Sequence, residues 1–214
     1  ATITVALGFP KLAHVISPGS EYSKKLVVAD IGIPPHEAQK LTLNLLTHEW
    51  VQSHLPQRSP RGHKGTFGHA LVIAGSTSYS GAAYLATQAA LRTGAGLVTL
   101  ASPEKIHPIL ASKLTEAIHL PLPDDQTGLL MSKSARIIKD QLSSYDSVAV
   151  GCGMGWSSAG QEFIEELLLD DRSFHLPLVI DADGLNNLSG IDDWWHRLPE
   201  SVVLTPHPGE MARL

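Results

Sequence analysis

The sequence predicts an α/β protein with a mostly parallel sheet and helices on both faces. Two observations favour this fold. From residue 69 onward, short apolar runs alternate with stretches of helical periodicity, and such an alternation implies right-handed crossovers between parallel strands. Several apolar runs also end in clusters of glycine and small polar residues, which are typical of loops at the carboxyl ends of parallel strands.

The strands of this region are expected where the apolar runs lie. They are His69–Ala74, Leu97–Ala101, Ala117–Leu120, Ser147–Gly151, Leu178–Ile180 and Ser201–Leu204. The first run is apolar almost throughout, as in a strand buried on both faces of a parallel sheet.

The helices between these strands follow the spacing of apolar residues and the positions of capping residues. They are expected at Ser80–Thr93, Pro103–Leu114, Leu129–Leu142 and Ala159–Leu169. Ser80 is expected to cap the first of them and Gly94 to end it. Pro103 is expected in the first turn of the second helix, where a missing N–H costs little.

The first 62 residues follow a different pattern. Two strand-like runs, Thr2–Leu7 and Leu26–Ile31, precede the pair Pro34-Pro35, and consecutive prolines end a strand or a helix. Residues 36–62 are expected to be a linker that contains a short helix at Leu46–Leu55. The predicted division is therefore residues 1–35, a linker at 36–62, and a larger domain at 63–214.

Both ends of the sequence look interrupted. Strand-like alternation begins directly after Ala1, and Pro208 opens a helix of which residues 211–214 form only the first turn. A single helical turn is unfavourable because nucleation costs more than one hydrogen bond returns. The pattern therefore predicts that the natural protein continues in both directions.

Composition excludes several classes of function. The chain has 214 residues, 43% of them hydrophobic and 17% charged, which is enough to bury a sizeable core. A net charge of −5 argues against nucleic-acid binding through a basic face. The single cysteine, Cys152, forms no internal disulfide and suits a reducing compartment such as the cytoplasm. Because no apolar run reaches about 18 residues, a membrane span is not expected.

Ligands of open parallel sheets bind beyond the carboxyl ends of the strands, so the loops there are the candidate sites. The loop from Gly75 to Ala83 has small residues and leads into a helix N-terminus, which favours anions; a plain connecting loop is the alternative. Gly151, Gly153 and Gly155 suit a phosphate cradle or a turn with positive φ angles. They do not match the dinucleotide-binding G-x-G-x-x-G pattern.

Two further loops carry ionisable residues. Asp181 and Asp183 follow a strand and suit a cation or a substrate hydroxyl, or alternatively turn and capping chemistry. Thr205-Pro206-His207 follows the last strand, with His207 between two prolines, and this histidine is either functional or structural. The G-x-S-x-G and H-E-x-x-H patterns are absent. The residues alone therefore favour an enzyme for nucleotides or phosphorylated ligands, with the reaction left open.

The motifs become specific when they are taken together and in order. They are His63–Gly68, Ala74–Ser76, Tyr79–Ala82, Arg92–Val98, Gly151–Gly155, Asp181–Asp183 and Thr205–Glu210. Over about residues 45–214 this set resembles the dehydratase domain of the NAD(P)H-hydrate repair enzymes. Cys152 departs from the proline that is common there. Residues 1–35 resemble the C-terminal tail of the NAD(P)HX epimerase domain, which bacterial members fuse in front of the dehydratase.

The resemblance implies a ribokinase-like fold, incomplete at the C-terminus. It implies ADP- or ATP-dependent dehydration of (6S)-NAD(P)H hydrate back to NAD(P)H, with Mg²⁺, and with K⁺ for the epimerase part. It also implies that the substrate-binding residues are Ala82, a glycine among Gly151, Gly153 and Gly155, and His207, with Asp183 close by. The family's catalytic aspartate, in a G-x-G-D motif, is expected beyond Leu214, so the chain is expected to have little activity alone.

The partners implied by the resemblance are the hydrate, an adenine nucleotide and further copies of the chain in a homo-oligomer. Two alternatives remain open. A ribokinase-type small-molecule kinase shares the fold and differs by releasing a stable phosphorylated product. A non-catalytic nucleotide-binding or oligomerisation module would lack the downstream aspartate motif.

Overall fold

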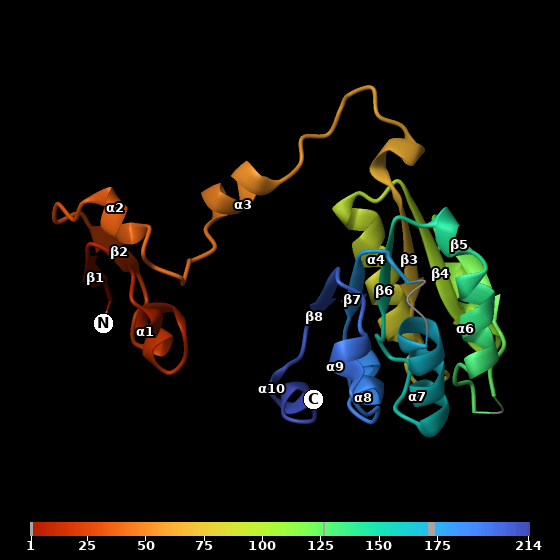
Figure 1. Ribbon diagram of the computed structural model, residues 1–214. Helices are drawn as coiled ribbons and strands as arrows, with labels where there is room; N and C mark the ends of the chain where they lie inside the picture. Colours follow the sequence, from red (N-terminus) through yellow and green to blue (C-terminus); the bar gives the residue numbers. More distant parts are fainter. Residues whose placement is uncertain (1, 126, 171–173) are drawn as a thin grey trace. The chain divides into compact units, whose positions relative to one another are not determined.

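A computed structural model describes residues 2–125, 127–170 and 174–214 of the chain. The chain divides into two compact units, residues 1–57 and 58–214, which are described separately (Figure 1). The boundary falls inside the stretch that the sequence predicts as a linker. Ala1, where the sequence pattern suggests an interrupted strand, lies outside the described residues.

The first unit is a small two-stranded sheet with short helices. Strand β1 (Thr4–Leu7) pairs in parallel with β2 (Leu26–Ala29), so both predicted strands are confirmed, with shorter bounds. The helices are α1 (Leu12–Val15), α2 (Pro35–Ala38) and α3 (His48–His54). Ala6 is buried, whereas Val5 and Leu7 beside it are more than half exposed. A two-stranded sheet with so little buried surface is marginal by itself.

The second unit is built on a parallel sheet, as the sequence predicts. Within the described residues its six strands have the order β5-β4-β3-β6-β7-β8. The bounds are β3 His69–Ile73, β4 Leu97–Pro103, β5 Ile118–Leu122, β6 Ser147–Val150, β7 Leu178–Ile180 and β8 Val202–Leu204. The chain proceeds from β3 toward one edge and then returns to place β6 on the other side of β3. Such a reversal separates the loops above the sheet and opens a crevice for ligands.

Helices cover both faces of this sheet. They are α4 Ser80–Thr93, α5 His107–Lys113, α6 Ser132–Lys139, α7 Ser158–Ile164, α8 Asp183–Leu188, α9 Trp194–Arg197 and α10 Pro208–Met211. One π-helical turn, Glu165–Leu169, extends α7. No helix in the three described stretches is long and apolar enough to cross a membrane.

Two local predictions need correction. Ser80 is the first residue of α4 rather than its cap, since Tyr79 occupies the cap position. Pro103 ends β4 instead of opening a helix, because it pairs with Leu122 of β5 and keeps an extended backbone. The helix there begins at His107. Gly94 does end α4, with a left-handed φ of 100°.

In the described part of the second unit, two helices are not predicted from the sequence. Helices α8 and α9 occupy six and four residues, which is too short for a clear helical period. Helix α8 begins at Asp183, within the segment Asp181–Asp183 that the sequence predicts as a loop. This start places Asp183 on a helix rather than in a turn.

The core lies on the face that α6, α7 and α8 cover. Leu71, Val148 and Ile180 point into it from three strands, and Phe163 and Ile164 of α7 fill it. These three helices lie side by side in Figure 1. This face buries the largest apolar cluster of the molecule among the described residues.

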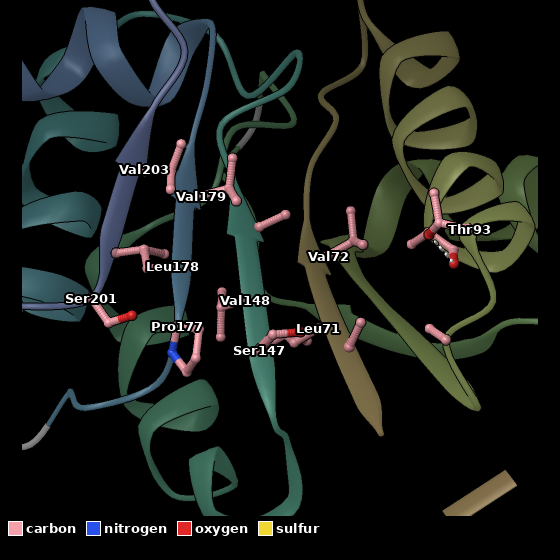
Figure 2. A pocket seen from close by; sticks show the side chains of 14 residues that line it. Leu71, Val72, Thr93, Ser147, Val148, Pro177, Leu178, Val179, Ser201 and Val203 are labelled. Atoms are coloured by element: carbon pink, nitrogen blue, oxygen red, sulfur yellow. Dashed lines mark hydrogen bonds between the residues drawn. The ribbon is translucent and has the colours of Figure 1, made fainter. Parts of the chain in front are cut away.

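The opposite face is covered only in part. Helices α4 and α5 pack on Val72, Val98 and Leu100, but Val179 of β7 and Val203 of β8 remain 38% and 58% exposed. Figure 2 shows a shallow pocket on this face, about 340 Å³ in volume, between α4 and these valines. Its lining includes the residues that begin β6 to β8, so it lies away from the strands' carboxyl ends.

Candidate functional site

Hydrogen bonds join the loops that follow β3, β6, β7 and β8. The N–H of Gly75 donates to the carbonyl of Cys152 at 2.9 Å. The thiol of Cys152 donates to Oδ2 of Asp181 at 3.5 Å, and the hydroxyl of Thr205 donates to Oδ1 of the same carboxylate at 2.8 Å. The four candidate loops therefore form one connected edge, as expected from the parallel arrangement of their strands.

The turn after β6 needs its glycines for packing. Gly151, Gly153 and Gly155 have φ angles of 125°, 70° and 82°, a region that other residues adopt only with strain. A Cβ on Gly151 would lie 1.9 Å from the carbonyl oxygen of Asp181. The glycines therefore let the loops after β6 and β7 approach each other at backbone distance.

Ala82 lies against this turn from the first turn of α4. A Cβ on Gly153 would come within 2.7 Å of the Ala82 methyl group and 2.8 Å of the Tyr79 Cβ. The N–H of Ala82 already donates to the carbonyl of Tyr79 at 3.1 Å. Ala82 and Gly153 are therefore neighbours, as expected for two residues of one predicted site. The methyl group of Ala82 faces the glycine turn, whereas its N–H is already bonded to Tyr79.

Asp183 is engaged with the same turn. Its Oδ2 accepts a hydrogen bond from the N–H of Gly155 at 2.9 Å, and its Oδ1 accepts one from the amide of Asn186 at 3.2 Å. Both oxygens therefore support the local backbone and the start of α8. Asp183 and Asp181 face different partners, although only Ala182 separates them in the sequence.

Ala182 adopts an unusual backbone conformation between the two aspartates. Its φ is 51° and its ψ is −119°, which is strained for a residue with a side chain. This backbone conformation directs the carboxylates of Asp181 and Asp183 toward different loops. No group of three or more potential metal-binding side chains occurs in the described part of the chain, so the aspartate pair has no third ligand for a cation.

Sequence reasoning missed Asn187, which is completely buried. Its amide group donates to the carbonyls of Gly155 and Asp183, both at 2.8 Å, and its Oδ1 accepts from the N–H of Ser157 at 3.1 Å. The only signal in the sequence is a polar residue between Leu185 and Leu188. Its partners lie about thirty positions away for two of the three bonds, so local patterns do not reveal them.

His207 caps the short helix α10. Its Nδ1 accepts hydrogen bonds from the N–H groups of Gly209 and Glu210, at 3.0 and 3.3 Å. The neutral ring therefore carries its proton on Nε2, which lies 3.2 Å from Oε1 of Glu210. The Glu210 side chain is 7% exposed and that of His207 is 63% exposed, so the ring edge is open to solvent.

The side chain of His207 forms no hydrogen bond with another predicted site residue within the described ranges. In the ranges that the structure describes, its side-chain hydrogen bonds stay within α10. The structure thus brings together Ala82 with Gly153, and Gly155 with Asp183. It connects His207 to that group through the preceding Thr205.

Cys152 lies at the centre of the edge. Burial, together with the nearby charge of Asp181 and the hydrogen bond to it, raises the pKa of its thiol from 9.0 to about 11. The thiol therefore stays protonated at neutral pH, as its hydrogen bond to Asp181 requires. This cysteine is a hydrogen-bond donor rather than a nucleophile.

Comparisons with known proteins match this arrangement. A family model described as NAD(P)H-hydrate dehydratase matches residues 70–214, which include all four loops. The chain belongs to this family. It is 41% identical to the bifunctional NAD(P)H-hydrate repair enzyme Nnr of Moorella thermoacetica over 216 aligned residues, which are 100% of this chain and 40% of that protein.

A shorter relative and its structure agree with the assignment. The ADP-dependent (S)-NAD(P)H-hydrate dehydratase of Bacillus subtilis is 31% identical over 78% of this dehydratase-family chain and 54% of its own length. A crystal structure of the ADP/ATP-dependent dehydratase from that organism, grown with ATP and Mg²⁺, has a TM-score of 0.60 over 78% of this chain and 54% of that chain. A ribokinase-like protein of Enterococcus faecalis, 24% identical, gives a TM-score of 0.64 over 79% of this chain and 55% of its own. The ribokinase-like fold is thereby confirmed, and the chain spans about 40% of the bifunctional relatives.

Proposed function

We propose that this chain supplies the hydrate-binding loops of an enzyme that returns hydrated NAD(P)H to NAD(P)H in the cytoplasm. The observation that carries the proposal is the family match over residues 70–214, which includes every loop of the hydrogen-bonded edge. Relatives named as ADP-dependent dehydratases support an adenine nucleotide as the phosphate donor.

The proposed chemistry solves a leaving-group problem. The hydrate carries a hydroxyl at C6 of the nicotinamide ring, and hydroxide leaves poorly. Transfer of a phosphoryl group from the nucleotide to this oxygen converts it into a phosphate ester. The C6–O bond then breaks with loss of phosphate, while a proton leaves the adjacent ring carbon and the dihydronicotinamide is restored. Such a transfer depends mainly on positioning and charge neutralisation.

The loops suggest how the hydrate is held. The Ala82 methyl group and the Gly153 backbone would form an apolar and closely approachable surface for the ring. The exposed ring of His207, whose Nε2 lies 3.2 Å from Oε1 of Glu210, would exchange this partner for an oxygen of the hydrate or its phosphate ester. Asp183 would act near the hydrate through the Gly155 N–H that it holds. This assignment makes Asp183 a support of the turn.

Magnesium is part of the proposal only for the complete enzyme. A relative was crystallised with ATP and Mg²⁺, but the described residues of this chain include no cluster of three metal-binding side chains. We therefore assign Mg²⁺ to no residue here.

The N-terminal unit belongs to a second part of the proposal. Residues 1–35 would be the end of an epimerase-like domain that interconverts the two hydrate epimers and uses K⁺. This is supported by the alignment of the whole chain with bifunctional relatives. A homo-oligomer is proposed for the assembled protein.

The decisive experiment uses the protein expressed from its full-length gene. Hydrated NADH is supplied with ADP, with ATP or without a nucleotide, and the reduced-nicotinamide absorbance is followed. Recovery with a nucleotide, and none without it, is expected. A stable phosphorylated product without recovery of NADH would instead indicate a small-molecule kinase. A folded protein that produces neither result would overturn the proposed function.

A further inference from the structure

We propose that Asp181 is a positioning residue that ties the His207 segment to the glycine turn and thereby sets the affinity for the hydrated nucleotide. The inference rests on the proposed function and adds a residue to it. It starts from one carboxylate whose two oxygens bond to segments that follow two different strands.

The two bonds of Asp181 connect the loops on either side of β7. Oδ1 accepts from the hydroxyl of Thr205, after β8, at 2.8 Å, and Oδ2 accepts from the thiol of Cys152, after β6, at 3.5 Å. Cys152 in turn accepts the N–H of Gly75 through its carbonyl. A single side chain therefore completes a line of contacts across four neighbouring strands.

The backbone holds this carboxylate in a defined direction. The N–H of Asp181 donates to the carbonyl of Val150 at 3.1 Å, and its own carbonyl accepts from the N–H of Gly184 at 3.0 Å. The strained Ala182 follows directly. Because Asp183 is used by Gly155 and Asn186, Asp181 alone of the two aspartates faces the Thr205 segment.

Thr205 links the position of the Asp181 carboxylate to the position of His207. Only Pro206 separates these two residues, and a proline has a fixed φ angle. The ring of His207 bonds within α10, so its position relative to the glycine turn follows from where α10 begins. Besides the bond to Asp181, the Thr205 hydroxyl lies 3.3 Å from the carbonyl of Ile180, and the Thr205 N–H donates to the same carbonyl at 3.2 Å. Loss of the carboxylate would leave these two longer contacts with Ile180 and let the histidine segment shift relative to the glycine turn.

A shift of this kind is expected to weaken binding more than turnover. His207 and the Gly151–Gly155 turn must contact the same hydrate, and a displacement of about 1 Å between binding groups can cost up to 100-fold in efficiency. The expected change for loss of the Asp181–Thr205 bond is a roughly tenfold higher KM for the hydrate, with kcat within about twofold.

The test uses the full-length protein and measures kcat and KM for hydrated NADH at saturating nucleotide. Asp181→Ala and Thr205→Val are expected to raise KM about tenfold, whereas Thr205→Ser keeps the hydroxyl and stays near the wild type. The double variant is expected to be no worse than the more impaired single variant, since both single changes already remove the Asp181–Thr205 bond. Asp192→Asn, at an exposed position, is the matched control for loss of an acidic charge.

The outcomes separate this inference from the function on which it rests. If the wild type does not dehydrate the hydrate, the proposed function and the positioning role of Asp181 are both refuted. If the wild type is active and Thr205→Val keeps a wild-type KM, only the positioning role of Asp181 is refuted. A lower melting temperature and a lower kcat without a change in KM would also refute it, because they indicate a merely structural residue.

Discussion

The two faces of the six-stranded sheet differ, although the same strands form both. Along β7, Leu178 and Ile180 are almost fully buried beneath the helices of one face, whereas Val179 between them is 38% exposed on the other. Val203 of β8 is 58% exposed on that same face. Residue type does not explain the difference, since all four are aliphatic. The covering helices do, because among the described residues the apolar cluster beneath α4 and α5 includes side chains of β3 and β4 but neither Val179 nor Val203.

This comparison limits what an apolar run can predict. A continuously apolar strand is typical of a sheet buried on both faces. That expectation is met at β3, where Val72 and Ile73 pack into the clusters of opposite faces and are both buried. It is not met at β7 and β8 in the residues that the structure describes. The open face presents apolar side chains to solvent and forms the pocket of Figure 2.

The largest effect is expected on the packed face. Phe163 is fully buried among residues of the sheet and α7, so Phe163→Ala should lower the free energy of unfolding by about 3–5 kcal/mol. Urea unfolding followed by circular dichroism measures this. A loss below about 1 kcal/mol would mean that the two faces do not differ as described.

The next largest effect concerns the polar group buried on the packed side. Asn187→Ala would leave the carbonyl of Gly155 and the N–H of Ser157 without their partner, at a cost of about 1–3 kcal/mol. Amide exchange at residues 155–157 should also become faster. Asn186→Ala, whose side chain is only partly buried, serves as the control. Unchanged exchange in Asn187→Ala would contradict the supporting role.

A smaller effect is expected at Cys152, which packs against the apolar cluster of the second face. Because burial and the neighbouring Asp181 raise the pKa of its thiol from 9.0 to about 11, the folded state favours the protonated form. Its contribution to stability is present below pH 9 and is lost as the pH rises to about 11. Alkylation rates between pH 7 and pH 12 report the titration. A midpoint near 9 would contradict burial beside Asp181.

The smallest effect is expected on the open face. Val203→Thr keeps the shape of the side chain and its preference for strands, and should change the free energy of unfolding by less than about 0.5 kcal/mol. Val148→Thr, at a buried position of the packed face, is the matched comparison and should cost several times more. Equal costs at both positions would show that the face over β8 is covered in solution.

The sequence predicts which loops form the candidate site, but it does not predict the hydrogen bonds that join them. The loops at Ala82, Gly151–Gly155, Asp181–Asp183 and His207 could be found because each follows a strand. Asn187 could not, because its partners are distant in the sequence. The different hydrogen-bond partners of Asp181 and Asp183 also depend on the positive φ of Ala182. No pattern of residue types indicates that backbone angle.

The sequence by itself determined the α/β class, the positions of the strands and the edge of the sheet at which the candidate loops lie. Apolar runs and turn residues are local signals, and parallel strands necessarily end at one edge. Only the tertiary structure decided which side of β3 receives β6, which face remains open, and that one carboxylate joins Cys152 to Thr205. Those features arise from contacts between distant segments, whose energies depend on three-dimensional packing rather than on neighbouring residues.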